Sequence, residues 1–252
     1  MKYLITICLG AFFSISLFAQ NKISLVKKIE KANKSVKFHK MEAISFDIDL
    51  KFGGKTGMKG TVISSTSSSF IKIIKADGTI LTFDGSKVWL SPAEKNYKGA
   101  RFDMFTWQYF FMAPFKYSDG GTKWEDLGNL IYTAETKLPA AKLTFESGTG
   151  DASGDYYLVY KNAKNLVEAM GYIVTFGGRN LDQAEKSAHA IVYSDYQNVD
   201  GVPIAMQWAF HNWNKEKGIS DKIGEAKITN VKFVKVLKED MKVAFDALEV
   251  KM

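Results

Sequence analysis

Two stretches of the chain alternate between apolar and polar residues, a pattern typical of a β-strand with one buried face. The first is 43–52 and the second is 202–210. Their apolar positions are Ile44, Phe46, Ile48, Leu50 and Phe52 in the first and Val202, Ile204, Met206, Trp208 and Phe210 in the second. Because each face is large and hydrophobic, it forms either the core of a sheet or the wall of a cavity that accepts an apolar ligand.

Tight turns connect several of the predicted strands. Asp-Gly pairs occur at 77–78, 84–85 and 200–201, and this pair favours the positive φ angles of a two-residue hairpin turn. We therefore expect each pair to join adjacent antiparallel strands. The other predicted strands are 61–65, 70–75, 80–83, 88–91, 123–132, 141–145, 156–160, 170–176, 191–196 and 228–237. Some ten closely spaced strands predict a mainly β (α+β) protein whose large antiparallel sheet curls.

Two segments have helical periodicity. Residues 24–34 form an amphipathic pattern behind Ser24, which can cap a helix. Residues 101–115 are apolar on almost all sides, which predicts a buried helix that ends at Pro114. This helix is either part of the core or a lid across the mouth of a cavity. The two alternatives overlap if the helix packs inside a curved sheet.

The first 19 residues have the features of a signal peptide for export. Lys2 gives a positive start, residues 4–18 form a short apolar run, and Ala19 supplies the small residue at the cleavage position. We expect a mature protein of residues 20–252, a single domain in the periplasm. The only cysteine, Cys8, lies in the removed segment, so the mature chain is expected to have no disulfide and no lipid anchor.

The charge pattern limits the classes of partner. The net charge is +7, but the lysines are spread along the chain and the only arginines are Arg101 and Arg179. A nucleic-acid-binding protein usually clusters its arginines, so no nucleic-acid partner is expected. The diffuse positive charge either keeps the protein soluble or favours transient contact with envelope membranes and their proteins.

Residues typical of catalysis are nearly absent from the sequence. His39, His189 and His211 lack the spacing of a metal site. The glycines of residues 148–154 lack the spacing of a dinucleotide-binding loop and predict a turn instead. There is no nucleophile elbow and no cysteine in the expected mature chain. The sequence therefore predicts a protein that is not an enzyme and that has no metal or cofactor.

Two hairpins resemble those of a known family. Residues 84–95 contain Asp-Gly, then Trp89, then Pro92, and residues 193–208 contain Tyr-x-x-Tyr followed by Gly-Val-x-Ile. Both are similar to hairpins of the LolA/LolB-like carriers that sort outer-membrane lipoproteins. The resemblance implies an unclosed antiparallel barrel, with two or three helices in its concave side and a hydrophobic interior that binds a lipid or the acyl chain of a lipoprotein. The end of the signal segment and the lysine-rich composition also resemble exported proteins of Bacteroidota.

One feature departs from this family. The sorting carriers use an arginine on an early strand to control cargo release, whereas the strands predicted at 43–52, 61–65 and 70–75 contain none. The departure argues against lipoprotein transfer but leaves a lipid-binding cavity as the expectation.

The apolar side chains give the candidate site. The hydrophobic wall predicted for a ligand consists of Phe46, Ile48, Leu50, Trp89, Met206, Trp208 and Phe210, and the predicted lid consists of Trp107, Phe110 and Phe111. The protein is then a monomeric, non-catalytic carrier or chaperone. In the alternative, these side chains fill a dry core and the protein is an interaction module that recognises another protein of the envelope.

Overall fold

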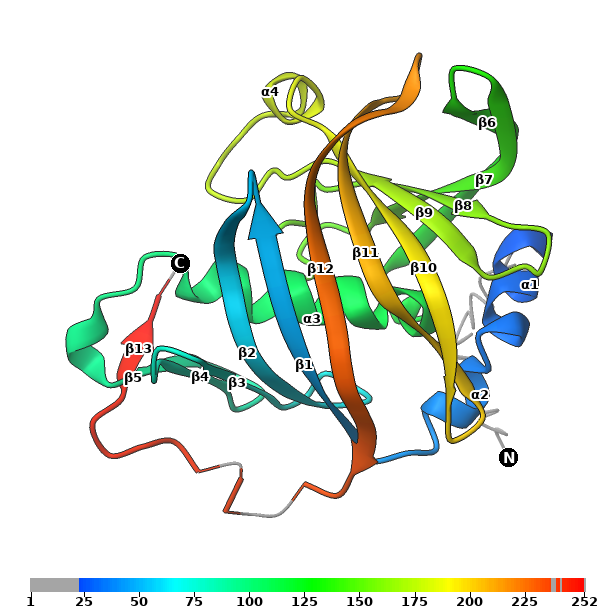
Figure 1. Cartoon of the computed structure of the whole chain (residues 1–252). Helices are drawn as coiled ribbons and strands as arrows, with labels where there is room; N and C mark the ends of the chain where they lie inside the picture. Colours follow the sequence, from blue (N-terminus) through cyan, green and yellow to red (C-terminus); the bar gives the residue numbers. More distant parts are fainter. Residues whose placement is uncertain (1–22, 237–238, 241, 252) are drawn as a thin grey trace, which may run out of the picture.

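The computed structural model describes residues 23–236, 239–240 and 242–251. In this part of the chain, thirteen strands form one antiparallel sheet in the order β13-β5-β4-β3-β2-β1-β12-β11-β10-β9-β8-β7-β6. The sheet curls but does not close, so that β13 and β6 are its two edges (Figure 1). The predicted mainly β fold with an unclosed antiparallel sheet is confirmed. The expected signal peptide lies outside the described residues.

The strand bounds agree with the alternating patterns and differ where the pattern is weak. The strands are β1 (Ala43–Phe52), β2 (Lys55–Ser65), β3 (Ile71–Lys75), β4 (Ile80–Phe83), β5 (Val88–Ser91), β6 (Thr122–Thr133), β7 (Thr136–Phe145), β8 (Tyr157–Lys161), β9 (Val167–Tyr172), β10 (His189–Val199), β11 (Val202–Asn214), β12 (Gly218–Val234) and β13 (Leu248–Val250). Strand β12 begins at Gly218 rather than at 228 because its polar first half pairs with β11. The short β13 was not predicted, and it is a strand because it pairs with β5.

All three Asp-Gly pairs join adjacent antiparallel strands, as predicted. The first connects β3 to β4, the second connects β4 to β5, and the third connects β10 to β11. In the third turn Asp200 has φ 48° and Gly201 has φ 80°. Two successive positive φ angles match the right-handed twist of the flanking strands.

Helices pack mainly on the concave side of the sheet. The described helices are α1 (Ser24–Ala32), α2 (Ser35–Phe38), α3 (Ala100–Lys116) and α4 (Leu181–Glu185), with a 3₁₀ turn at Ala93–Lys95. Buried side chains of α1, α2 and α3 share one core with the inner face of the sheet. Helix α3 crosses behind β1, β12 and β11, whereas α1 and α2 lie at one end (Figure 1). Helix α1 confirms the predicted helix, but Ser24 is its first residue and makes no capping bond.

The prediction that α3 ends at Pro114 was wrong, since the helix continues to Lys116. Proline lacks an N–H, so it leaves the carbonyl oxygen four residues earlier, that of Phe110, without its helical donor. The hydroxyl of Tyr193 donates to this oxygen at 3.0 Å. A side chain from β10 thus replaces the missing hydrogen bond, and the helix tolerates the proline.

A second, smaller core lies on the outer side of the sheet and was not predicted. Its buried members include Tyr160 from β8, Ala184 from α4 and Trp213 from β11. The residues between β9 and β10 thus fold back to bury the outer face of the strands around them. This core explains why strands β8 to β10 are rich in apolar residues on both faces.

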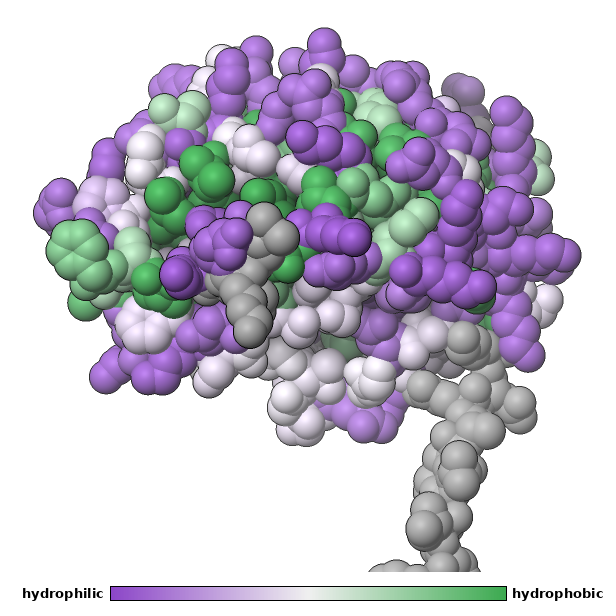
Figure 2. Space-filling model, turned by 90° about the horizontal axis from the view of Figure 1, so that it is seen from below, coloured by the Kyte–Doolittle hydropathy of each residue, from purple (hydrophilic) through white to green (hydrophobic). Residues whose placement is uncertain are grey.

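The C-terminal part of the chain crosses the outer face of β3 to β5. Lys72 Nζ donates to the carbonyl oxygen of Asp240 at 3.1 Å, and Ser91 Oγ donates to Asp246 at 2.8 Å. Strand β13 then returns to pair with β5. Seen from below, this side of the molecule shows apolar side chains gathered in its centre and hydrophilic ones around them (Figure 2).

We predict that Gly171→Ala destabilises the fold through the second core. A Cβ at residue 171 would lie 2.6 Å from Trp213 Cε2, and Trp213 is buried. Overpacking of this kind costs about 1–3 kcal/mol. Urea denaturation measures the loss, and Gly120→Ala is the control because a Cβ there meets no atom within 4 Å. An unchanged midpoint for Gly171→Ala would show that the indole moves aside without cost.

Candidate functional site

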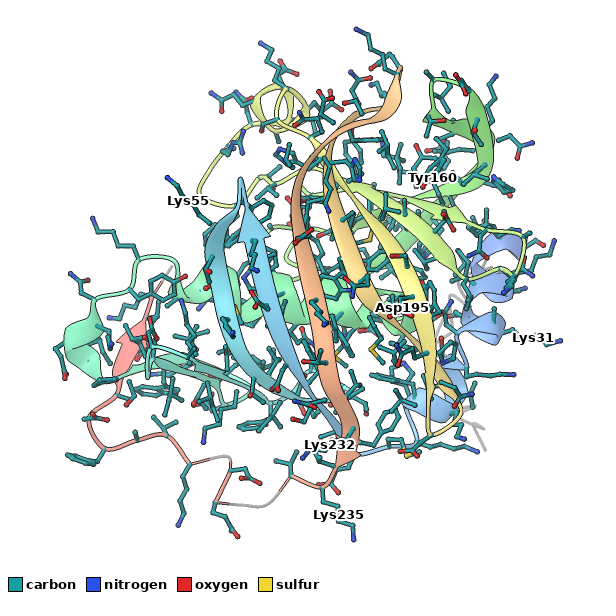
Figure 3. All side chains as sticks on the ribbon, viewed as in Figure 1. Lys31, Lys55, Tyr160, Asp195, Lys232 and Lys235 are labelled. Atoms are coloured by element: carbon teal, nitrogen blue, oxygen red, sulfur yellow. The ribbon has the colours of Figure 1, made fainter. Side chains whose placement is uncertain are left out.

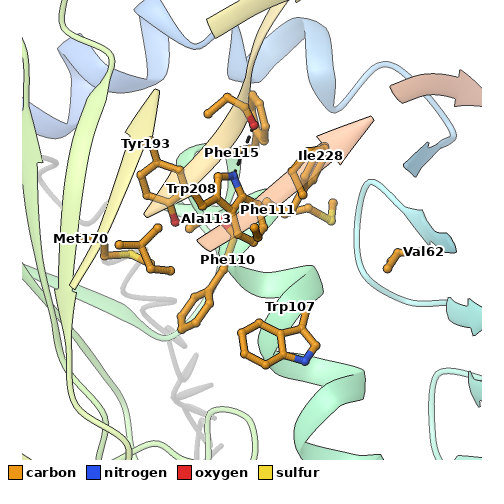
Figure 4. Close-up of a cluster of buried hydrophobic side chains, with 14 of the residues drawn as sticks. Val62, Trp107, Phe110, Phe111, Ala113, Phe115, Met170, Tyr193, Trp208 and Ile228 are labelled. Atoms are coloured by element: carbon orange, nitrogen blue, oxygen red, sulfur yellow. Dashed lines mark hydrogen bonds between the residues drawn. The ribbon is translucent and has the colours of Figure 1, made fainter. Parts of the chain in front are cut away.

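Most of the side chains predicted as wall and lid pack directly against each other. The rings of Phe46 and Phe111 stack with centroids 3.8 Å apart. Trp107 meets Phe210 edge to face at 6.2 Å, and Phe111 lies 6.4 Å from Trp208. Figure 4 shows the close packing of Phe111 and Trp208 in this cluster. The space between β1, β11 and α3 is therefore occupied by side chains.

The remaining predicted side chains fall into two groups. Ile48, Leu50, Met206 and Phe110 belong to the same main core. Trp89 does not, because it alternates with the buried Val88 and Leu90 and so lies on the outer face of β5. Its Nε1 donates to the carboxylate of Asp84 at 2.7 Å. The fold therefore brings nine of the ten predicted residues together and separates Trp89 from them.

A gap near Trp208 and Phe111 measures only about 10 Å³, roughly the space of one water molecule. A cavity lined largely by aromatic side chains lies instead on the opposite side of α3 and measures about 480 Å³. Its apolar lining is Ile71, Phe83, Phe102, Phe105, Phe110, Phe145, Val174 and Phe176, joined by Tyr109, Tyr157 and Tyr172. Of the ten predicted residues, only Phe110 lines this cavity.

Helix α3 separates the filled core from the cavity. The residues that it buries in the core include Met104, Trp107 and Phe111. Those that it turns to the cavity include Phe102, Phe105, Thr106 and Tyr109, which are only half-buried. Both sets recur at intervals of three and four, and at 100° per residue they lie on opposite faces of the helix. One helix thus completes the core with one face and forms the cavity wall with the other.

Polar contacts anchor the two ends of α3. Near its start the buried carboxylate of Asp103 accepts a hydrogen bond from Trp107 Nε1 at 2.7 Å and lies 3.5 Å from Lys75 Nζ. Near its end, Ser35 Oγ donates to the carbonyl oxygen of Pro114, and His39 Nε2 lies 2.7 Å from that of Phe115. These partners satisfy groups that the helix itself leaves unpaired.

The rim of the cavity is formed by two glycine-rich loops, one at 148–154 and the other just after β9, where Thr175 precedes Gly177 and Gly178. The loop at 148–154 forms turns, as predicted, and its Asp151 is ion-paired to Arg101 of α3, with Nη2 donating at 2.8 Å. Asp155 accepts hydrogen bonds from the amide and hydroxyl of Thr175, at 2.7 and 2.8 Å. Burial raises the pKa of the Asp155 carboxyl, and the bonds from Thr175 oppose that rise. The two loops are thus tied to each other and to α3.

Sequence analysis did not predict this rim because the residues that form it lie far apart in the chain. The face of α3 that lines the cavity carries a detectable signal, the aromatic residues at 102, 105 and 109. The loop carboxylates carry no such signal, because only the fold places Asp151 beside Arg101.

Among the described residues, no group of three or more His, Cys, Asp or Glu side chains could hold a metal ion. His211 Nδ1 lies 2.8 Å from the carbonyl oxygen of Ser220, and the three histidines lie on separate elements. In the same part of the chain, no helix has the length and hydropathy needed to cross a membrane. Lysines such as Lys31, Lys55, Lys232 and Lys235 project outward at separate places (Figure 3).

Comparison with known proteins identifies the fold. The structure is similar to that of a LolA superfamily protein from Nitrosomonas europaea, with a TM-score of 0.54 and 11% identity over 88% of this chain and 99% of that one. It is also similar to a DUF1329 family protein from Desulfovibrio piger, with a TM-score of 0.53 and 12% identity over 86% of this chain and 96% of that one. The predicted LolA-like fold is confirmed. No protein-family model and no curated protein matches the sequence.

We predict that the two faces of α3 respond differently to truncation. Phe111→Ala should cost about 3–5 kcal/mol because it removes a buried ring stacked on Phe46. Phe105→Ala should cost only about 1 kcal/mol because its ring already borders a cavity. Chemical denaturation of both variants measures the difference. Equal losses would mean that the cavity face is packed as tightly as the core face.

Proposed function

We propose that the protein is a periplasmic, non-enzymatic carrier or chaperone that binds a hydrophobic ligand in the cavity beside α3. The observation that supports this most strongly is the cavity itself, about 480 Å³ and lined mainly by aromatic side chains. This volume falls within the range of roughly 300–1,000 Å³ found for small-molecule sites. The proposed ligand is a lipid or the acyl chain of a lipoprotein, bound by a monomer of residues 20–252.

The physical basis of binding is the transfer of alkyl groups out of water. Each buried methylene contributes about 0.8 kcal/mol, so an acyl chain needs no strong polar contacts to bind. The aromatic lining supplies a surface for such a chain on both sides, from α3 and from strands β4, β7 and β9 with their loops. The fold shared with a LolA superfamily protein is consistent with a cavity of this kind.

The predicted wall and lid take different roles in this proposal. Phe110 is proposed to contact the ligand, since it lines the cavity. Phe46, Ile48, Leu50, Met206, Trp208, Phe210, Trp107 and Phe111 are proposed to hold α3 in place, and Trp89 has no role in the site. Strands β1, β2 and β3 contain no arginine, so release by the mechanism of the sorting carriers is not part of the proposal.

The alternative of an envelope interaction module has one observation in its favour. The space between α3 and the sheet is filled, as expected if the apolar strands form only a core. The two functions differ in what occupies the far side of α3. A carrier uses the cavity there, whereas an interaction module has no need of it.

We predict that Thr106→Trp abolishes binding of the hydrophobic fluorophore N-phenyl-1-naphthylamine without unfolding the protein. Thr106 lines the cavity from α3, and the indole would occupy the space that the probe requires. Because the side chain enters a void, the melting temperature should stay near that of the parent. Fluorescence titration and thermal denaturation measure the two effects.

The matched control is Val36→Trp, which adds the same ring to an exposed site on α2. It should bind the probe like the parent. If the parent does not bind the probe, or if Thr106→Trp binds it unchanged, the cavity is not a ligand site and the carrier proposal is wrong.

A further inference from the structure

Three tyrosines stand next to one another in the wall of the cavity. Tyr157 on β8 and Tyr172 on β9 are directly paired across the two strands, so their side chains share the concave face. The ring of Tyr109 on α3 lies 5.5 Å from that of Tyr157. All three residues line the cavity, and Tyr157 and Tyr172 are buried.

The hydroxyls of these tyrosines make no hydrogen bond to any residue that the structure describes. Two other tyrosines of the interior do make one, whereas the buried hydroxyl of Tyr117 does not. Tyr193 donates to the carbonyl oxygen of Phe110, and Tyr196 donates to that of Val167 at 2.7 Å. None of these three hydroxyl oxygens is sealed from solvent, so each is accessible from the cavity and can bond a polar group of a ligand.

Asp155 adds a negative charge to the lining of the same cavity. Burial is the main cause that raises the pKa of Tyr157, and the charge of Asp155 raises it further. The pKa of Tyr109 is raised in the same way by burial, by Asp119 and by Asp155. The carboxylate therefore lies within electrostatic range of Tyr109 and Tyr157. Its Oδ1 accepts both bonds from Thr175, whereas its Oδ2 has no hydrogen bond or ion pair with the described residues.

The cations around the cavity are already neutralised. Arg101 is ion-paired to Asp151, and Lys116 Nζ lies 2.5 Å from Asp119. Among the charged residues of the lining, Asp155 alone has no charged partner in the described chain. In a partly buried site of low dielectric, this charge disfavours a second anion and favours a group that donates hydrogen bonds.

We propose that the carboxylate of Asp155 and the hydroxyls of Tyr109, Tyr157 and Tyr172 bind the polar end of an amphiphile that donates hydrogen bonds, an ammonium or a hydroxyl, while its alkyl chain lies along the phenylalanines. This inference rests on the proposed function and specifies its ligand class. A fatty-acid carboxylate would face Asp155 without a free cation to pair with, so it binds more weakly than an amine of the same chain length.

The test uses three ten-carbon amphiphiles that compete with N-phenyl-1-naphthylamine for the full mature chain. Decylamine carries a donating ammonium, decyltrimethylammonium carries the same charge without a donor, and decanoate carries a carboxylate. We expect decylamine to bind about tenfold more tightly than either of the others, the effect of one charge-assisted hydrogen bond. Equal affinities for all three would overturn the inference while leaving the carrier proposal intact.

Two variants test whether Asp155 causes the preference for decylamine over decanoate. Asp155→Asn keeps an oxygen for Thr175 but removes the charge, so the preference for decylamine over decanoate should disappear. The control is Asp126→Asn, an exposed carboxylate on β6 away from the cavity lining, which should keep the preference. If Asp155→Asn retains the full preference, the carboxylate does not recognise the ligand and the inference is wrong.

Tyr157→Phe and Tyr172→Phe provide a second test, in variants that are expected to keep the stability of the parent. Because neither hydroxyl bonds a described residue, their removal should leave the melting temperature unchanged. Each should weaken decylamine binding severalfold and leave binding of the naphthylamine probe unaltered. Unchanged decylamine affinity in both would overturn the role of the tyrosines. Failure of the parent to bind the probe would instead contradict the carrier proposal itself.

Discussion

The stacking of α3 against the inner face of the sheet determines the rest of the structure. An antiparallel sheet that curls without closing leaves an apolar concave face, and that face must be covered by helices because the described residues form only one sheet. Phe111 packs on Phe46, and Trp107 packs against Phe210, so the helix supplies the missing half of the core. A helix that was polar on one side would suit a surface position, whereas α3 is apolar nearly all round and has to be enclosed.

Because both faces of α3 are enclosed, the cavity lies on the face that the sheet does not contact. The sheet can contact only one face of α3, and the opposite face is covered by the loops at 148–155 and 174–176 together with side chains of β4 and β7. The cavity lies between these loops and the helix. The cavity and the core are therefore on two sides of one element, and α3 must be held firmly for the cavity to keep its shape.

The contacts at the ends of α3 meet this requirement with polar groups rather than additional apolar area. Asp103 fixes the first turn through Trp107 and Lys75. Tyr193 supplies the hydrogen bond that Pro114 removes, and Ser35 of α2 and His39 just after it bind the last carbonyl groups. Buried polar groups such as these are costly unless they are paired, so they fix the position of the helix along the sheet. The hydroxyls of Tyr109, Tyr157 and Tyr172 in the cavity wall do not position the helix, because they bond none of the described residues.

The sequence alone determined most of the strands, the Asp-Gly hairpins and the class of fold, but not β13 or the first half of β12. Strict alternation specified β1 and β11, and the Asp-Gly pairs specified three turns, because these signals depend only on neighbouring residues. It also identified α3 as buried. Only the tertiary structure decided which face of α3 meets the sheet, that Pro114 stays within the helix, and that the cavity lies beside Phe105 rather than Met206. These outcomes depend on contacts between residues far apart in the chain, such as Tyr193 with Phe110 and Arg101 with Asp151, and no local pattern encodes such contacts.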